Sequence, residues 1–305
     1  MVRWPTRGLG DPRSPCKKTG ALPRELTFVR ADPAGNITIF VLDRLDDPDL
    51  RLRAARALLA EPSLKAEQVG FVIPPPAAAG GLAGPAGVQP GAQVAARYWR
   101  LDMMGGEFCG NAARSFGLYA ARDMGLRGKQ DLCIGVSGAS APVAVHVDLD
   151  ASTAEVEIPG PRAEVLLSWK GRSFPALCFD GITHVIAEGL EGDRDMVFGL
   201  LESVRQAGGS AAALGVMFYD PGRRFMRPVV YVAATESLVF ESSCGSGTAA
   251  LAAYLSRALT GGRERLKIFQ PGGVIDVRVE KQAGKIKTIG IGGPVGLDGS
   301  TIIRC

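Results

Sequence analysis

Short segments in which apolar residues alternate with polar ones, or form brief apolar runs, recur along the whole chain and are typical of β-strands. They are separated by glycine- and proline-containing turns. The predicted strands are Leu26–Arg30, Ile37–Leu42, Ala95–Leu101, Leu132–Val136, Ala141–Val147, Glu155–Ile158, Phe174–Phe179, His184–Ile186, Leu214–Tyr219, Pro228–Ala233 and Leu238–Glu241, followed by a glycine-punctuated meander from Ile268 to Gly293.

Four longer segments carry apolar or small residues at helical spacing instead: Asp47–Leu59, Asn111–Met124, Asp195–Ala207 and Thr248–Leu259. The last is rich in alanine, which lets a helix approach its neighbours closely and suits a central position inside a sheet. Mixed strands with one long central helix in each half predict an α/β (α+β) protein with two similar domains.

The length of 305 residues also favours two domains. We expect residues 1–24, rich in proline, glycine and basic side chains, to be a disordered extension. Residues 25–138 then form an N-terminal domain, to which residues 295–305 return, and residues 139–294 form a C-terminal domain. The uncharged stretch 71–94 is interrupted by prolines and glycines, which predicts a loop insertion and not a membrane-spanning helix.

The amino-acid composition argues against several classes of function. Hydrophobic residues make up 46% and charged residues 22%, and the net charge of +4 comes without a basic stripe, which disfavours a nucleic-acid partner. Six scattered cysteines and two histidines do not suggest a metal site. The N-terminus lacks an apolar signal segment, so a reducing cytoplasmic location with free thiols is expected, without membrane association.

Two motifs carry the chemistry: Cys109-Gly110-Asn111 and Cys244-Gly245-Ser246, each placed where a predicted helix begins. Unpaired backbone N–H groups and the positive end of the helix dipole stabilise a thiolate at such a position. The same groups can hold a substrate carboxylate. Two such sites on one substrate would move a proton at a carbon next to a carboxylate, with one sulfur as base and the other as acid.

These motifs resemble those of the diaminopimelate epimerase-like, cofactor-independent amino-acid racemases and epimerases. Supporting motifs follow the family's order along the chain: Gly35-Asn36, Gly247 after the second cysteine motif, Pro271-Gly272-Gly273 and Gly292-Gly293-Pro294. The resemblance implies two pseudo-symmetric domains, each a sheet rolled around a central helix. It also implies a two-base mechanism that needs neither pyridoxal phosphate nor a metal.

The resemblance further implies a role for individual residues. Cys109 and Cys244 would be the acid/base pair, and the backbones of Gly110-Asn111 and Gly245-Ser246 would hold the substrate's α-carboxylate. Asn36 and His184 match positions that line the site. Read without the family, Asn36 is equally a turn residue, and His184 is equally a buried core histidine.

The chain departs from diaminopimelate epimerases where these recognise the distal end of their substrate. The stretch Ala234–Glu241 lacks the expected arginine, and Ile182 replaces the asparagine of an Asn-Pro-His motif. Diaminopimelate would leave buried charges unpaired there, so a different amino acid is expected. Histidine racemases that feed opine-type metallophore synthesis fit this pattern best. Asp102 or Glu236 would pair with the imidazole, unless both are solvated surface charges.

Three other functions stay open from sequence. The protein could be a diaminopimelate epimerase with an unusual clamp, or a non-catalytic protein that binds an amino acid. A proline or hydroxyproline racemase is disfavoured, because these typically carry histidine at the position of Asn111. In each case the partner is a small amino acid, and a homodimer is compatible with the sequence. Two partly ionised thiols near one substrate also predict that activity depends on a reductant.

Overall fold

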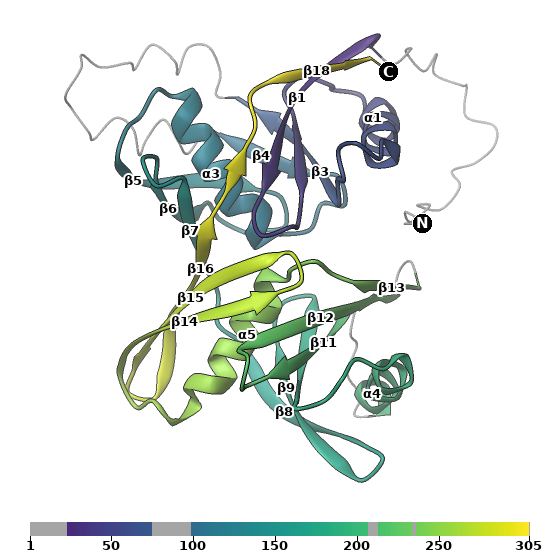
Figure 1. Cartoon of the computed structure of the whole chain (residues 1–305), viewed down its shortest axis with the longest axis vertical. Coiled ribbons are helices and arrows are strands. Elements are labelled where there is room, and N and C mark those ends of the chain that lie inside the picture. The colour runs from purple at the N-terminus through teal and green to yellow at the C-terminus, as the bar shows by residue number, and fades with distance from the viewer. Residues whose placement is uncertain (1–22, 75–98, 207–212, 234–235, 305) are drawn as a thin grey trace. The chain divides into compact units, whose positions relative to one another are not determined.

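The structure is a computed structural model that describes residues 23–74, 99–206, 213–233 and 236–304 (Figure 1). Its described residues form two compact units. The N-terminal unit comprises residues 23–158 and 291–304, and the C-terminal unit comprises residues 159–290. Residues 1–22 of the expected extension and residues 75–94 of the expected loop insertion lie outside the described residues.

Strands dominate the N-terminal unit. β1 pairs antiparallel with β2, β17 and β18, β3 pairs antiparallel with β4, and β5 pairs antiparallel with β6. β2 with β3 and β4 with β5 pair in parallel. The strands are β1 (Glu25–Asp32), β2 (Thr38–Val41), β3 (Gln68–Ile73), β4 (Arg100–Met103), β5 (Lys129–Val136), β6 (Val143–Asp148), β7 (Thr153–Ile158), β17 (Gly296–Leu297) and β18 (Thr301–Arg304). β6 also pairs antiparallel with β7, next to the end of β16 (Lys285–Pro294).

The boundary between the units differs from the predicted one. Residues 138–139 lie in the turn between β5 and β6, and these two strands pair antiparallel from Lys129 opposite Asp148 onward. Their hydrogen bonds keep both strands in one sheet, so the boundary falls after Ile158 and not at 138–139. At the other end of the chain, the return to the N-terminal unit begins at Ile291, where the prediction placed it at residue 295.

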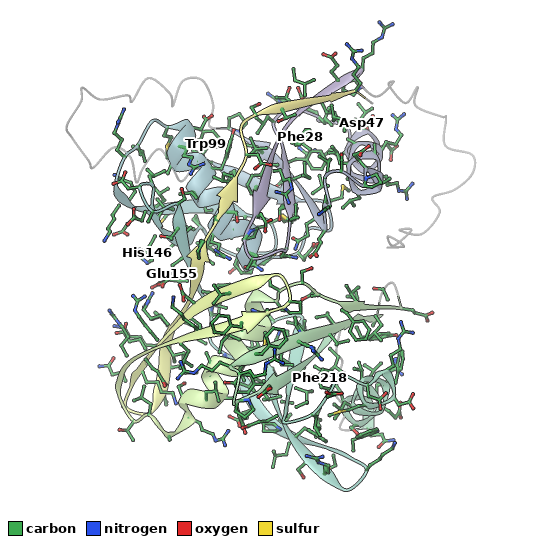
Figure 2. The ribbon with its side chains drawn as sticks, in the orientation of Figure 1. Phe28, Asp47, Trp99, His146, Glu155 and Phe218 are labelled. Carbon is green, nitrogen blue, oxygen red and sulfur yellow. The ribbon has the colours of Figure 1, made fainter. Side chains whose placement is uncertain are left out.

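In its described residues, the N-terminal unit also contains the helices α1 (Pro48–Ala60) and α3 (Gly110–Asp123). Asp47 caps α1 by accepting a hydrogen bond from the backbone N–H of Asp49, and it lies at the start of that helix in Figure 2. α3 is buried around most of its circumference and contacts β1, β5, β6 and β7. A helix that is buried on all sides is a central one. The predicted helices Asp47–Leu59 and Asn111–Met124 are confirmed.

β3 is a strand that the sequence pattern did not predict. Residues 71–73 belong to it, although they were expected to open a loop insertion. The run from Val69 to Val72 is buried, because β3 lies between β2 and β4 and packs on both faces. A continuous apolar run that leads directly into a proline-rich stretch lacks the alternation that marks a half-buried strand. The strand β8 (Ala163–Trp169) was not predicted either.

The C-terminal unit contains the strands β8 to β15 and most of β16. β8, β9 and β10 pair antiparallel in sequence, β10 and β11 pair in parallel, and β11, β12 and β13 continue antiparallel. β14 pairs antiparallel with β15. The bounds are β8 (Ala163–Trp169), β9 (Arg172–Cys178), β10 (Ile182–Glu188), β11 (Ala213–Asp220), β12 (Phe225–Val232), β13 (Ser237–Phe240), β14 (Gly262–Gln270) and β15 (Gly273–Gln282).

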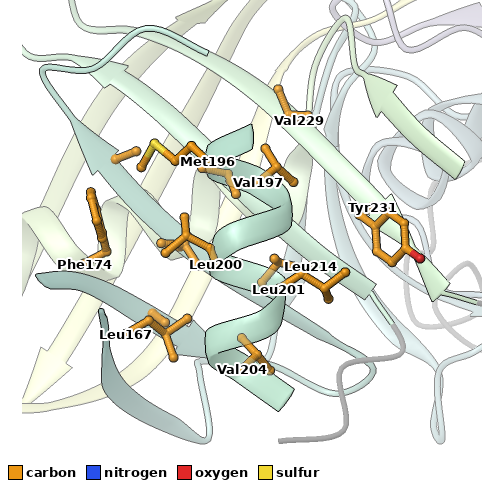
Figure 3. Close-up of a cluster of buried hydrophobic side chains, with 14 of the residues drawn as sticks. Leu167, Phe174, Met196, Val197, Leu200, Leu201, Val204, Leu214, Val229 and Tyr231 are labelled. Carbon is orange, nitrogen blue, oxygen red and sulfur yellow. The ribbon is translucent and has the colours of Figure 1, made fainter. Parts of the chain in front are cut away.

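Helix α4 (Arg194–Gln206) connects the parallel strands β10 and β11. Its apolar face, including Leu200 and Val204, packs on a buried cluster with residues of the sheet (Figure 3). α5 (Gly245–Leu255) continues into a 3₁₀ turn at Ser256–Ala258 and is buried along most of its alanine-rich length. It contacts β9, β10, β11 and β15, so it is the central helix of this unit. Both helices were predicted, with ends displaced by a few residues.

Candidate active site

Each of the two motif cysteines is the N-cap residue of the central helix of its unit. Cys109 caps α3 with φ −120° and ψ 114°, and Cys244 caps α5 with φ −127° and ψ 113°. Extended backbone at this position is what an N-cap requires, because the chain must enter the helix from outside while its first N–H groups stay unpaired. The two motifs therefore adopt the same local structure.

The N-terminal thiol site consists of Cys109, Asn36, Asn111, Glu67, Gln68 and Arg114. The thiol of Cys109 lies 3.8 Å from Oδ1 of Asn36, and Nδ2 of Asn111 lies 3.5 Å from the same oxygen. Asn36 follows the turn after β1, in which Ala34 and Gly35 both have positive φ. Glycine tolerates this conformation at no steric cost, and the turn delivers Asn36 to the first helix. Three predicted residues are thus brought together.

Glu67 and Gln68 belong to this site although the sequence pattern did not single them out. Nδ2 of Asn36 donates a hydrogen bond of 2.7 Å to the Glu67 carboxylate, and Nε2 of Gln68 donates one of 2.7 Å to Oδ1 of Asn36. Both residues reach Asn36 because β2 and β3 pair in parallel, with the backbone N–H groups of Glu67 and Gln68 on the carbonyl of Ile37. In the sequence, these two residues could have been recognised as a polar pair that directly precedes the apolar run Val69–Val72.

Arg114 also belongs to this site, although the sequence pattern did not single it out. Its side chain is fully buried in α3 and donates from Nε to Oδ1 of Asn111 at 3.2 Å. Nη1 donates to the carbonyls of Gly293 and Pro294 at 3.1 and 3.2 Å. The Gly292-Gly293-Pro294 motif therefore has a structural role, since its backbone carbonyls hold the arginine that in turn holds Asn111.

The C-terminal thiol site consists of Cys244, Ser246, His184, Gln270 and Thr248. The sulfur of Cys244 accepts from the backbone N–H of Gly247 at 3.4 Å and lies 3.7 Å from Oγ of Ser246. Its own backbone N–H donates to Oε1 of Gln270 at 2.9 Å, and Nε2 of Gln270 donates to the Thr248 hydroxyl at 2.9 Å. Gln270, which directly precedes the Pro271-Gly272-Gly273 motif, was not predicted to take part.

His184 joins this site from β10. Its Nε2 lies 2.9 Å from Oγ of Ser246, and its ring makes an edge contact with Phe179. Burial lowers the pKa of His184 to about 3, so the imidazole is neutral at physiological pH. Nδ1 is buried and has no hydrogen-bond partner among the residues that the structure describes. Gly215 on β11 makes room for the ring, because a Cβ there would lie 2.3 Å from Nδ1.

The environment of Cys244 differs from the sequence-based expectation of a readily ionised thiol. Burial raises the pKa of Cys244 well above its ordinary value, and the nearby Glu241 carboxylate raises it further. The Gly247 N–H and the Ser246 hydroxyl act in the opposite direction. The helix N-terminus does supply a donor to the sulfur, as expected, but the loss of hydration outweighs it because the thiol is fully enclosed.

Within the described part of the chain, Asp102 and Glu236, the two carboxylates suggested for an imidazole, form no hydrogen bond or ion pair with a residue of either thiol site. Asp102 on β4 forms ion pairs with Arg51 of α1 at 3.3 Å and with Arg100 at 2.7 Å. Glu236 is exposed in the turn that precedes β13. Their role in substrate binding stays a prediction. Among the described ranges, no helix is long and apolar enough to cross a membrane.

Solved structures with a similar fold place the protein in a structural class. The chain aligns with a hydroxyproline epimerase from Agrobacterium vitis with a TM-score of 0.60 and 14% identity, covering 92% of this chain and 93% of the other. A probable proline racemase from Agrobacterium radiobacter K84 gives a TM-score of 0.58 at 14% identity, covering 90% and 92%. A PhzC/PhzF protein from Clostridium difficile gives 0.55 at 13%, covering 92% and 100%. The protein has the fold of proline racemase-like and PhzF-like isomerases.

Sequence comparison defines the family. Residues 25–301 match the family described as the histidine racemase CntK N-terminal domain, and the chain belongs to that family. It is 32% identical over 263 residues to a histidine racemase of Fusobacterium nucleatum subsp. nucleatum, covering 84% of this chain and 90% of that protein. A histidine racemase of Staphylococcus aureus is 27% identical over 258 residues, covering 82% and 87%. The protein is an isomerase, and the resemblance carried by its motifs is confirmed.

Proposed function

We propose that the protein racemises histidine at the α-carbon, with the thiols of Cys109 and Cys244 as the two proton-transfer groups. Membership of the histidine racemase family and the two curated relatives support the substrate. The observation that carries the mechanism is the matched position of the two cysteines, each at the N-cap of a central helix with nearly identical backbone angles.

In the proposed reaction, one sulfur in the thiolate form removes the α-proton and becomes a thiol. The other thiol delivers its proton to the opposite face of the same carbon and becomes a thiolate, so that the configuration inverts and charge is conserved. The electron pair released at the α-carbon spreads onto the substrate carboxylate. Backbone N–H groups at Gly110-Asn111 and Gly245-Ser246 would hold that carboxylate and stabilise its added charge.

The C-terminal thiol site contains a group suited to assist this step. A neutral His184 can donate from Nε2 to the Ser246 hydroxyl, which can then donate its own proton to the sulfur of Cys244. This arrangement favours the thiolate at the moment when Cys244 acts as a base. It offsets part of the penalty that burial imposes on the charged sulfur.

The test is proton NMR in deuterium oxide with the reduced enzyme and L-histidine, diaminopimelate and L-proline as separate substrates. Loss of the α-proton signal of histidine alone is expected, because abstraction is followed by deuterium delivery. Cys109→Ala and Cys244→Ala should each abolish the exchange. Cys133→Ala and Cys178→Ala, which remove cysteines on β5 and β9, are the matched controls and should leave it intact.

Other outcomes discriminate between the remaining functions. Exchange of diaminopimelate but not of histidine would identify an epimerase with an unusual clamp. Binding of an amino acid without exchange would identify a non-catalytic binding protein. Exchange of histidine that persists in Cys109→Ala or in Cys244→Ala would refute the two-thiol mechanism. It would not contradict histidine as the substrate.

A further inference from the structure

The side-chain amide of Asn36 can turn either its carbonyl oxygen or its NH₂ group toward the thiol of Cys109. Its orientation therefore determines whether the sulfur faces a hydrogen-bond acceptor or a donor. The carbonyl oxygen can only accept a hydrogen bond, whereas the amide NH₂ group can only donate. A thiol beside an acceptor keeps its proton, and a thiolate beside a donor is stabilised. The orientation of a side-chain amide must be deduced from the groups around it.

Glu67 fixes that orientation from one end. An ionised carboxylate has no proton to donate, so the group facing it at 2.7 Å must be the NH₂ of Asn36. Oδ1 of Asn36 then points the other way, toward Gln68 and toward the thiol of Cys109 at 3.8 Å. Rotation of the amide would place two acceptors against each other at Glu67.

Arg114 fixes the neighbouring amide from the other end. A guanidinium group only donates, so the atom of Asn111 that faces Arg114 Nε at 3.2 Å must be Oδ1. Nδ2 of Asn111 is thereby turned toward Oδ1 of Asn36, at 3.5 Å. Glu67 and Arg114 thus lie at the two ends of one series of hydrogen bonds through Asn36 and Asn111. Both require the same orientation of the two amides, with Oδ1 of Asn36 facing Nδ2 of Asn111.

The environment of the sulfur agrees with this direction. The side chain of Cys109 makes no capping hydrogen bond to α3, unlike Cys244, which accepts from the N–H of Gly247. In its contact with Asn36, the thiol of Cys109 is the donor and Oδ1 is the acceptor. Oε1 of Gln68 is left buried without a hydrogen bond to any described residue, which is the cost of turning its NH₂ toward Asn36.

We propose that Glu67 is a positioning residue that holds the Asn36 carbonyl toward Cys109 and so keeps this cysteine in the protonated form in the enzyme without substrate. Only the consequence, that Cys109 then starts as the proton donor, rests on the proposed function. The resting state of the thiol can be measured without any substrate, so a failure of one proposal is distinguishable from a failure of the other.

The experiment measures the rate at which iodoacetamide alkylates Cys109 as a function of pH. The full-length reduced protein is alkylated, then digested, and the modified peptides are quantified by mass spectrometry. Cys133 serves as a reference within the same chain. In Glu67→Gln the residue at position 67 no longer requires an NH₂ group opposite it, whereas Gln68 and Asn111 still hold the Asn36 carbonyl in its direction. The amide can then turn its NH₂ toward the sulfur more readily, so the thiolate becomes easier to form. A fall of one unit in the pKa of Cys109 corresponds to a rate about tenfold higher at neutral pH.

Two controls separate orientation from charge. Glu107→Gln removes an exposed carboxylate two positions before Cys109 in the chain, and it should leave the rate unchanged. In an Asn36→Leu background no amide is present to be turned, so Glu67→Gln should have no further effect there. Glu67 is itself exposed, so its substitution is not expected to impair folding.

The proposal is overturned if Glu67→Gln leaves the alkylation rate of Cys109 unchanged. It is also overturned if Glu107→Gln raises the rate equally, or if the effect of Glu67→Gln persists in the Asn36→Leu background. Either of the last two results would mean that Glu67 acts by its charge alone.

Discussion

The two thiol sites share their backbone and differ in the groups around the sulfur. Cys109 is half-buried and faces a carbonyl oxygen that two charged residues hold in place. Cys244 is buried and receives donors from the Gly247 N–H and the Ser246 hydroxyl. The same helix N-cap therefore supports two thiols of different character, because the contact of Cys109 comes from Asn36, outside its motif, whereas the donors to Cys244 come from the start of its own helix.

The largest effect on stability is expected from the groups that anchor each helix start. Arg114→Met would leave the carbonyls of Gly293 and Pro294 and Oδ1 of Asn111 without this donor in a buried site. We expect a loss of about 3 kcal/mol in the free energy of unfolding, measured with urea. Gln270→Leu removes the corresponding anchor of Cys244 and should cost about 2 kcal/mol. Equal or negligible losses would contradict this ranking.

Acidification should affect the C-terminal unit through His184. Its pKa is about 3 in the folded protein, against 6.5 when unfolded, so the unfolded chain binds a proton first as the pH falls. Stability therefore decreases below pH 6.5, by about 2 kcal/mol at pH 5. His184→Gln should reduce this pH dependence in urea unfolding. A pH dependence equal to that of the parent protein would argue against a buried neutral imidazole.

Loss of the Ser246 hydroxyl should sharpen the contrast between the two sulfurs. This hydroxyl lowers the pKa of Cys244, so Ser246→Ala should raise that pKa and slow the alkylation of Cys244 at fixed pH by up to about tenfold. Ser246→Thr keeps the hydroxyl and should restore the rate. Alkylation of Cys109, followed in the same digest, should not change. An unchanged alkylation rate of Cys244 in Ser246→Ala would show that the Ser246 hydroxyl does not lower the pKa of this thiol.

The smallest effect is expected at the two carboxylates outside the sites. Asp102 already holds Arg51 and Arg100, so we expect Asp102→Asn to leave KM for histidine unchanged and to lower stability by about 1 kcal/mol or less. Glu236 is exposed, and Glu236→Gln should likewise leave KM unchanged. A clear rise in KM for either variant, measured by the rate of α-proton loss, would restore it as a recognition residue.

The sequence by itself determined the features that depend on local physics. The predicted helices that begin near Asn111 and Thr248 are present, because helix periodicity and an N-cap residue act over a few positions. The cysteine motifs and their spacing also identified the family, which the sequence comparison confirmed. Asn36 and His184, predicted only by resemblance, lie beside Cys109 and Ser246 respectively.

Tertiary structure decided what depends on partners far away in the chain. Glu67 reaches Asn36 only because β2 and β3 pair in parallel, and Arg114 reaches Gly293 only because the end of the chain returns to the N-terminal unit. The unit boundary moved to Ile158 because β5 and β6 form one hairpin. The high pKa of Cys244 also follows from burial, which no short motif encodes, since hydration is lost only when distant segments close over the sulfur.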